Sequence, residues 1–203
     1  MLGQDPDSDR FAGAEREYVV QSLMRSLVVN LPSPPLPQSP SSGQWTIFTG
    51  DQLGSLFASF ILDIFKQSTA TSHQPLTKLA MVASIVSSKM IEAMAQVEGF
   101  KFVQCLTGFK YIGNTCLNLV EEGYEVPFGY EEAIGFMFGD EIRDKDGVAA
   151  TVRRTKVMSF LIIADRVFLV GGNLIQMTFV QLVVALNAQG KTLKGHLQSL
   201  YEK

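Results

Sequence analysis

Residues 79 to 86 are Leu-Ala-Met-Val-Ala-Ser-Ile-Val, and this run carries most of the information on the fold class. It is almost continuously apolar, which is typical of a β-strand that is buried on both faces of a parallel sheet. A helix with apolar residues on one face follows, with Ser87 and Ser88 as candidate caps and Gly99 as its end. A strand that turns directly into a helix is the repeating unit of α/β domains.

The same strand–turn–helix order occurs on both sides of this run. Before it, a short strand at 45–48 leads into a helix that begins with the Thr-x-x-Gln spacing of a capping box and runs to about Lys66. A polar loop is expected from there to Pro75. After the run, strands are expected at 100–106 and 126–130, with a helix between them. The order predicts an α/β domain with a largely parallel sheet.

The two ends of the chain are less regular. Residues 1–18 contain an acidic loop and a possible strand, and residues 19–44 are rich in proline and serine, which indicates a linker or insertion. Residues 45–203 form the predicted domain, with a helix start at 148–152, an interruption at 153–178 and two helices near the C-terminus.

Composition excludes several classes of protein. The 203 residues suffice for one domain, or for one domain and a fragment of another. A net charge of −3 argues against a nucleic-acid partner. The longest apolar stretch, 157–170, is too short for a membrane span and contains Asp165 and Arg166. Two cysteines and an acidic N-terminus lead us to expect a cytoplasmic protein with no membrane partner.

The sequence Asp5-Pro6-Asp7-Ser8-Asp9-Arg10 places three carboxylates at alternate positions. Two unit charges at about 4 Å repel by about 1 kcal/mol in water and by about 4 kcal/mol at an effective dielectric constant near 20. A hard cation such as Mg²⁺ or Ca²⁺ would reverse that sign, and Arg10 could hold a phosphate. An EF-hand is excluded because arginines occupy its required glycine and glutamate positions. An acidic terminus with chance spacing remains the alternative.

A second candidate site follows the expected strand at 100–106. Gly108 would permit close backbone approach by a ligand, while Thr107 and Lys110 offer polar contacts. The end of a strand is also where α/β folds place ligand loops. A plain β–α turn is the alternative.

Two further groups carry charge near strand or helix ends. Glu131 and Glu132 follow a short strand and could accept hydrogen bonds from sugar hydroxyls. Lys145, between two aspartates, could serve as a phosphate ligand or proton donor. The alternatives are a charged strand end and a capped helix with surface charges.

Taken together, the motifs resemble those of the α-D-phosphohexomutase family. They are Asp-Pro-Asp-Ser-Asp-Arg, Phe-Thr-Gly-Asp-Gln-Leu-Gly, Val-Ser-Ser-Lys, Leu-Thr-Gly-Phe-Lys-Tyr-Ile-Gly-Asn, Gly-Tyr-Glu-Glu-Ala-Ile-Gly-Phe and Asp-Lys-Asp-Gly-Val, in the family's order. The resemblance covers residues 3–17, 45–152 and about 179–203. The chain has Ala133 where other phosphoglucomutases have serine. In this respect it is most similar to the phosphopentomutase and glucose-1,6-bisphosphate synthase branch.

This resemblance implies a fold and an activity. The fold would be a three-layer α/β/α domain with a mostly parallel mixed sheet, preceded by a remnant of the second domain of such an enzyme. The activity would move a phosphoryl group between C1 and C5 or C6 of a sugar phosphate, through an enzyme phosphoserine and a bisphosphate intermediate. The partner would be ribose, deoxyribose or glucose phosphate, and the cofactor would be Mg²⁺.

The resemblance also implies a role for each matching residue. The Mg²⁺ ligands would be Asp5, Asp7 and Asp9. Arg10 would lie beside the reacting phosphoryl group, and Lys145 would contact the substrate and assist proton transfer. The substrate-binding residues would be Thr107, Gly108, Phe109 and Glu131.

The chain departs from the family pattern in three respects. The family's serine loop, Thr-Ala-Ser-His-Asn-Pro, is not found, and Ser72, in a loop that looks similar, is not expected to be a nucleophile. The domain that binds the distal phosphate is also not found. Residues 19–44 and 153–178 have no counterpart, which suggests translated intronic sequence or a gene-model error. We therefore expect an inactive fragment of a mutase, with a non-catalytic sugar-phosphate or protein-binding module as the alternative.

Overall fold

The structure is a computed structural model of the chain, and it describes residues 2–7, 9–16, 45–72, 75–139, 142–146, 153–154, 161–163, 166–168, 175–176 and 178–202. The predicted linker at 19–44 and the predicted helix start at 148–152 lie outside the described residues, as does most of the predicted interruption at 153–178. None of the helices among these residues is long and apolar enough to span a lipid bilayer.

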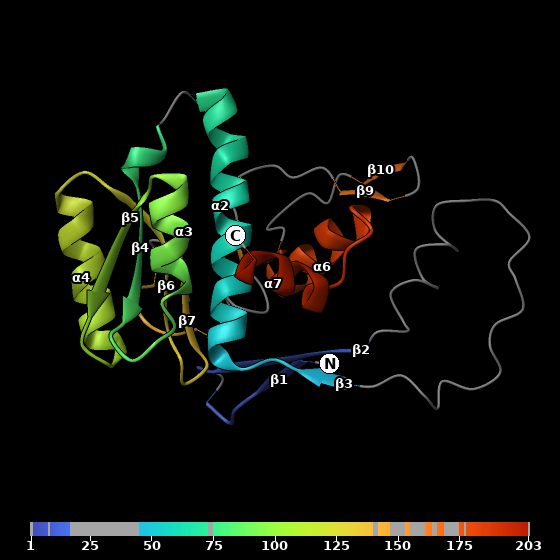
Figure 1. Cartoon of the computed structure of the whole chain (residues 1–203), viewed down its shortest axis with the longest axis horizontal. Coiled ribbons are helices and arrows are strands. Elements are labelled where there is room, and N and C mark those ends of the chain that lie inside the picture. Colours follow the sequence, from blue (N-terminus) through green and yellow to red (C-terminus); the bar gives the residue numbers. More distant parts are fainter. Residues whose placement is uncertain are drawn as a thin grey trace, which may run out of the picture.

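A four-stranded sheet in the order β5-β4-β6-β7 forms the centre of the domain (Figure 1). β4 (Leu79–Ser84) runs parallel to both β5 (Lys101–Cys105) and β6 (Glu125–Glu131). β7 (Gly135–Phe138) pairs with β6 in the antiparallel direction. The prediction of a mostly parallel mixed sheet is confirmed, although β7 itself was not expected.

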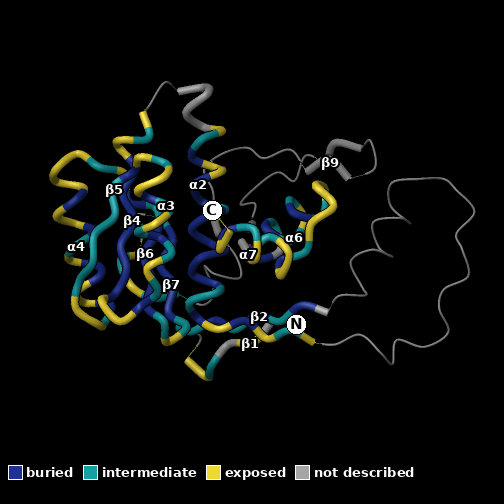
Figure 2. Tube along the Cα trace, viewed as in Figure 1, coloured by how far each residue is buried: buried dark blue, intermediate teal, exposed yellow. Residues whose placement is uncertain are grey.

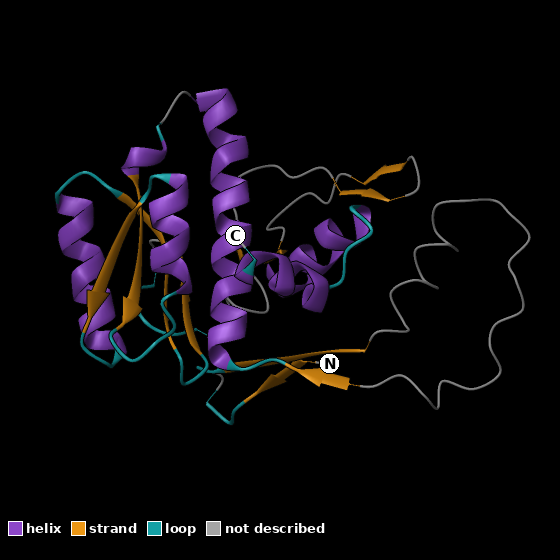
Figure 3. Cartoon of the chain, viewed as in Figure 1, coloured by secondary structure: helices purple, strands orange, loops and turns teal. Residues whose placement is uncertain are grey.

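Helices cover both faces of this sheet, which confirms the three-layer arrangement (Figure 3). Successive side chains of β4 point to opposite faces of the sheet, so that Met81 contributes to one apolar cluster and Val82 to the other. The first cluster includes α2 (Gly50–Ser72) and α3 (Met90–Glu98), and the second includes α4 (Phe109–Glu121).

A smaller antiparallel sheet contains β1 (Leu2–Gln4), β2 (Phe11–Arg16) and β3 (Trp45–Ile47). Buried positions run along the trace from β2 to α2 (Figure 2), and buried aromatic rings join this sheet to the main domain. The ring of Phe57 in α2 lies 5.9 Å from that of Phe11 in β2 and 5.1 Å from that of Phe136 in β7. The strand that follows the acidic loop is therefore packed onto the domain core.

Two C-terminal helices lie against α2, namely α6 (Thr178–Ala188) and α7 (Leu193–Tyr201). The buried carboxylate of Glu15 in β2 accepts hydrogen bonds from the backbone N–H groups of Leu193 (3.0 Å) and Lys194 (3.2 Å). A carboxylate at a helix N-terminus satisfies free N–H groups and complements the helix dipole. Glu15 thus ties β2 to the last helix.

The remaining described elements are short. A 3₁₀ turn, η1 (Leu76–Lys78), precedes β4. Two two-stranded pairs lie within the predicted interruption, and they are β9 (Leu161–Ile163) with β10 (Arg166–Phe168) and β8 (Arg153–Arg154) with β11 (Ile175–Gln176).

Two local predictions need correction. The expected polar loop after Lys66 is helical as far as Ser72, because the stretch contains neither glycine nor proline to end α2. The N-cap of α3 is Lys89 rather than Ser87 or Ser88, although Ser88 Oγ still accepts a 3.2 Å hydrogen bond from the Met90 N–H.

The capping box at the start of α2 is confirmed. The Thr49 N–H donates to Gln52 Oε1 at 2.9 Å, and the Gln52 N–H donates to Thr49 Oγ1 at 3.3 Å. These reciprocal bonds fix where α2 begins.

Candidate functional site

The carboxyl ends of β4, β5 and β6 lie at one edge of the sheet, and the acidic loop is docked beside them. The backbone of Arg10 forms a bridge with Gly135, the first residue of β7. The Phe11 N–H donates to the carbonyl of Ile134 at 3.1 Å. These two contacts bring the acidic loop to the edge of the sheet where α/β folds place ligands.

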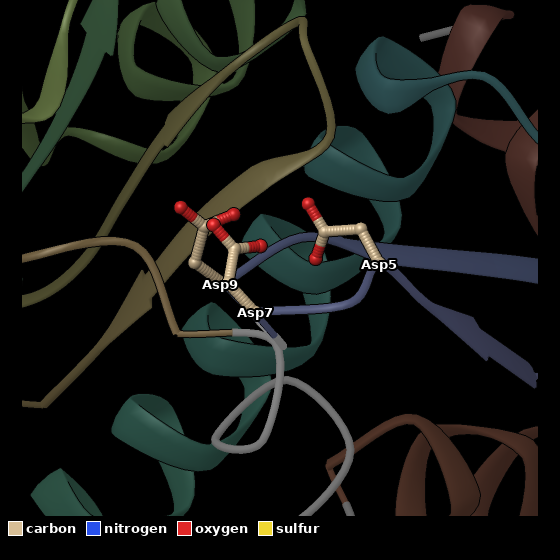
Figure 4. Close-up of side chains that lie close together, drawn as sticks. All are labelled: Asp5, Asp7 and Asp9. Carbon is tan, nitrogen blue, oxygen red and sulfur yellow. The ribbon is translucent and has the colours of Figure 1, made fainter.

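The three aspartates of this loop converge. Asp5, Asp7 and Asp9 each offer a carboxylate oxygen, and these oxygens lie within 4.8 Å of one another (Figure 4). The Arg10 N–H donates to Asp5 Oδ1 at 3.0 Å, and its guanidinium lies 3.2 Å from Asp5 Oδ2. The loop therefore presents several acceptor oxygens and one cation within a small volume.

Hydrogen bonds within the loop favour the ionised form of Asp5. Removal from solvent acts to raise the pKa of Asp5, but hydrogen bonds from the backbone of Arg10 and from the side chains of Asp7 and Arg10 together outweigh it, so that the pKa is lowered from its ordinary value of 3.8. Asp5 is thus ionised at neutral pH, as a cation ligand must be.

Lys145, in the segment that follows β7, also contacts this loop. Its ammonium group lies 3.1 Å from Asp9 Oδ2. The other oxygen of that carboxylate, Asp9 Oδ1, is buried and has no hydrogen-bond partner among the described residues. A buried carboxylate oxygen without a partner is costly, and a bound cation would satisfy it. The residues present therefore fit a hard divalent cation.

The loop after β5, which contains Thr107 and Gly108, contacts Glu131 at the end of β6 directly. The Gly108 N–H donates to Glu131 Oε2 at 3.2 Å. Gly108 has a φ of 109°, which is open to glycine and strained for other residues, and Glu131 is only 6% exposed. Thr107 is exposed at this edge, whereas the Phe109 side chain is buried in the core under α4. Of Phe109, only the backbone is left to face a ligand.

Several polar residues at this edge were missed by sequence reasoning. Ser84 Oγ, at the end of β4, lies 2.7 Å from Ser87 Oγ and 3.3 Å from Glu132 Oε2. Both serines are buried. The available signal was Ser84 itself, the single serine within the otherwise apolar run at 79–86.

A second missed contact holds the loop after β4. Asp51 Oδ1 in the first turn of α2 accepts hydrogen bonds from the Ser88 N–H (2.8 Å) and from the hydroxyl of Tyr130 (3.0 Å). Burial and the charge of Asp51 raise the pKa of Tyr130, so the phenol stays protonated and donates. Ser88 is thereby fixed next to the end of β6.

Ser72 lies far from this edge. The carbonyl of Glu132 packs against Gly50 at the first turn of α2, whereas Ser72 ends the same helix, roughly 33 Å away at 1.5 Å per residue. His73 lies outside the described residues. The expectation that Ser72 is not a nucleophile stays a prediction.

Comparisons with known proteins establish the family to which this fold belongs. The family described as phosphoglucomutase/phosphomannomutase, alpha/beta/alpha domain III, matches residues 49–161, and the chain belongs to it. A solved structure of a Thermus thermophilus protein assigned to the phosphomannomutases has a TM-score of 0.53 and 16% identity. The match covers 98% of this chain and 29% of that chain, and it confirms the fold.

Individual relatives confirm the predicted branch of the family. The phosphoribomutase of Saccharomyces cerevisiae is 40% identical over 152 residues, which are 75% of this chain and 21% of the relative. The human glucose 1,6-bisphosphate synthase and phosphopentomutase are each 36% identical over 161 residues, which are 79% of this chain and 22% of each relative. The chain thus spans about a fifth of the length of these relatives.

Proposed function

We propose that this chain forms the metal loop and the sugar-orienting surface of a phosphosugar mutase. The reaction is transfer of a phosphoryl group between C1 and C5 or C6 of a sugar phosphate, through a bisphosphate. The observation that supports this most directly is the docking of the three-aspartate loop beside Glu131 and Gly108. These groups come from segments far apart in the sequence, yet they share one edge of the sheet.

The aspartate loop would hold Mg²⁺ through Asp5, Asp7 and Asp9. When bound, the cation would supply neutralisation of the negative charge on phosphate oxygens. The unpartnered Oδ1 of Asp9 supports this assignment. Asp5, held by Arg10, is already ionised and in place.

Arg10 and Lys145 are the two cations of the site. The side chain of Arg10 is 42% exposed, so that its guanidinium can turn from Asp5 and hold two phosphate oxygens at once. The ammonium of Lys145 would donate to the substrate from the opposite side and assist proton transfer there. Both side chains would hold the phosphoryl group without forming a covalent bond to it.

Glu131 would orient the sugar. One of its oxygens already accepts from Gly108, and the other has capacity to accept from a sugar hydroxyl. The backbone of Gly108 and the side chain of Thr107 complete this surface. The serine nucleophile that the family resemblance implies has no matching motif in the printed sequence, so we expect binding by this chain but no turnover.

We also propose a reducing compartment such as the cytoplasm. Cys105 and Cys116 are both free, and burial raises the pKa of Cys116 to about 12. A buried thiol of this kind is inert and is not exposed to oxidants.

The test is calorimetric titration of the 203-residue chain with glucose 1,6-bisphosphate in the presence of Mg²⁺. The Glu131→Gln variant should bind at least about tenfold more weakly, since a charged acceptor contributes about 1.5–3 kcal/mol. The control is Glu122→Gln, an exposed residue after α4. Equal effects of the two substitutions would contradict the assignment of Glu131. Turnover of ribose 1-phosphate or glucose 1-phosphate by the chain would contradict the expected need for a nucleophile elsewhere.

A further inference from the structure

The turn between β6 and β7 holds a residue in an unfavourable conformation. Ile134 has a φ of 55°, the only positive φ of a non-glycine residue in the described part of the chain. Glu131 pairs with Gly135, so residues 132–134 form a three-residue turn whose last position is left-handed. Glycine is usual there, and a β-branched side chain is a clear exception. The conformation of Ile134 must therefore be held by its neighbours.

Those neighbours include the first turn of α2, where the Glu132 carbonyl and the Ile134 nitrogen lie close to Gly50, and the strand of the aspartate loop. The carbonyl of Ile134 accepts the 3.1 Å hydrogen bond from the Phe11 N–H, and Arg10 bridges Gly135. The side chain of Ile134 packs against the main apolar cluster, of which Phe11 is a buried member. Residues 10 and 11 are thus among the contacts that hold the left-handed conformation.

The other end of the same turn carries Glu131. Its carboxylate accepts from the Gly108 N–H, and a Cβ at Gly135 would lie 3.1 Å from Glu131 Cγ. Because the side chain is packed this closely against the turn, a change of backbone conformation at residue 134 would displace it. The same turn therefore contacts both the aspartate loop and the carboxylate assigned to the sugar.

We propose that Ile134 is a positioning residue that couples a divalent cation at the aspartate loop to a sugar phosphate at Glu131, an inference that rests on the proposed function. A cation that orders the loop strengthens the docking of Arg10 and Phe11 on the turn. Ile134 then stays left-handed, and Glu131 stays in place. Without the cation the docking loosens, Ile134 relaxes towards negative φ, and Glu131 shifts. By linkage, the sugar phosphate tightens cation binding by the same factor.

The Ile134→Gly variant tests this coupling. Glycine adopts a left-handed conformation without strain, so the turn no longer depends on the docking of residues 10 and 11. The measurement is calorimetric titration of the full chain with glucose 1,6-bisphosphate, with and without Mg²⁺. We expect Mg²⁺ to tighten binding to the wild-type chain by at least about fivefold. In Ile134→Gly the ratio should fall to about one, because the affinity without Mg²⁺ rises.

If Ile134→Gly binds the bisphosphate more tightly than the wild-type chain without Mg²⁺, the residue acts by positioning Glu131. A variant that had only lost packing would not gain affinity. The control is Ile47→Gly in β3, whose side chain is 76% exposed and which should keep the wild-type ratio. The inference is overturned if Ile134→Gly keeps the wild-type ratio, as it would if Mg²⁺ acted only through direct contact with the phosphate. It is also overturned if this variant binds the bisphosphate more weakly both with and without Mg²⁺. A wild-type ratio near one overturns the inference but leaves the proposed function. Absence of bisphosphate binding in both conditions overturns the proposed function and the inference with it.

Discussion

The ammonium group of Lys145 lies 3.1 Å from the carboxylate of Asp9, although one residue follows the central sheet in the chain and the other precedes it. Lys145 therefore neutralises part of the charge of Asp9, which a divalent cation at the aspartate loop would also neutralise. The two positive charges would compete for one carboxylate.

This competition predicts the effect of Lys145→Met. Removal of the ammonium should strengthen Mg²⁺ binding by roughly three- to tenfold, because Asp9 loses its competing cation. The free energy of unfolding without Mg²⁺ should fall by about 1 kcal/mol, as expected for a partly exposed ion pair. Calorimetry and urea denaturation measure the two effects. The control is Lys66→Met, which breaks the ion pair with Glu98. If Mg²⁺ affinity drops in Lys145→Met and not in the control, Lys145 does not compete with Mg²⁺ for Asp9.

The lowered pKa of Asp5 predicts a pH dependence of stability. Because its pKa in the folded state lies below the ordinary value of 3.8, the stabilisation is complete above that value and is lost as the pH falls through the lower folded pKa. The wild-type chain should therefore lose stability more steeply below about pH 4 than Asp5→Asn. Urea denaturation between about pH 5 and pH 2 measures the slopes, and parallel slopes would exclude a role for Asp5.

The segment that carries Lys145 packs closely against Gly113 in α4. A Cβ at this position would collide with the backbone carbonyl oxygen of Arg143, two residues before Lys145. Gly113→Ala should lower the free energy of unfolding by about 1–3 kcal/mol, whereas glycine to alanine in an open helix stabilises by up to about 1 kcal/mol. Denaturant titration gives the sign. The control is Gly3→Ala, which should be nearly neutral because its Cβ would make only an ordinary van der Waals contact with Ala12. Stabilisation by Gly113→Ala would show that the segment of Arg143 and Lys145 does not pack against α4.

Tyr130 links the end of β6 to the start of α2. Its buried hydroxyl donates to Asp51, which also accepts from the Ser88 N–H. Tyr130→Phe should cost about 1.5–3 kcal/mol, the usual range for a hydrogen bond to a charged group. Thermal or chemical denaturation is sufficient to test this. Tyr111→Phe, at an exposed position in α4, should have no measurable effect, and equal stability of the two variants would refute the contribution of this bond.

Local sequence patterns predicted β4, whose continuous apolar run matches a fully buried strand, and α4, whose apolar period matches its buried face. The strand β6 and the helix α3 were predicted as well. β7 was missed for a physical reason. Its hairpin lacks the glycine, asparagine or aspartate that normally marks a left-handed turn position, since Ile134 stands there. A strained residue held by distant contacts leaves no local signal.

The candidate site was predictable to the same extent. The three aspartates are neighbours in sequence, and their convergence follows from their spacing. The contact of Lys145 with Asp9 and the cap that Glu15 provides for α7 join segments far apart in the chain. No spacing rule reveals such pairs, because they depend on tertiary packing, such as that of Phe11 in β2 against Phe57 in α2.

The central claim is that the aspartate loop holds a divalent cation, and a Mg²⁺ titration of the full chain by calorimetry tests it most directly. We predict saturable binding by the wild-type chain, at least about tenfold weaker binding by Asp7→Asn, and unchanged binding by Asp63→Asn, an exposed residue on α2. Identical Mg²⁺ affinities for all three proteins, or no binding by the wild-type chain, would contradict the claim.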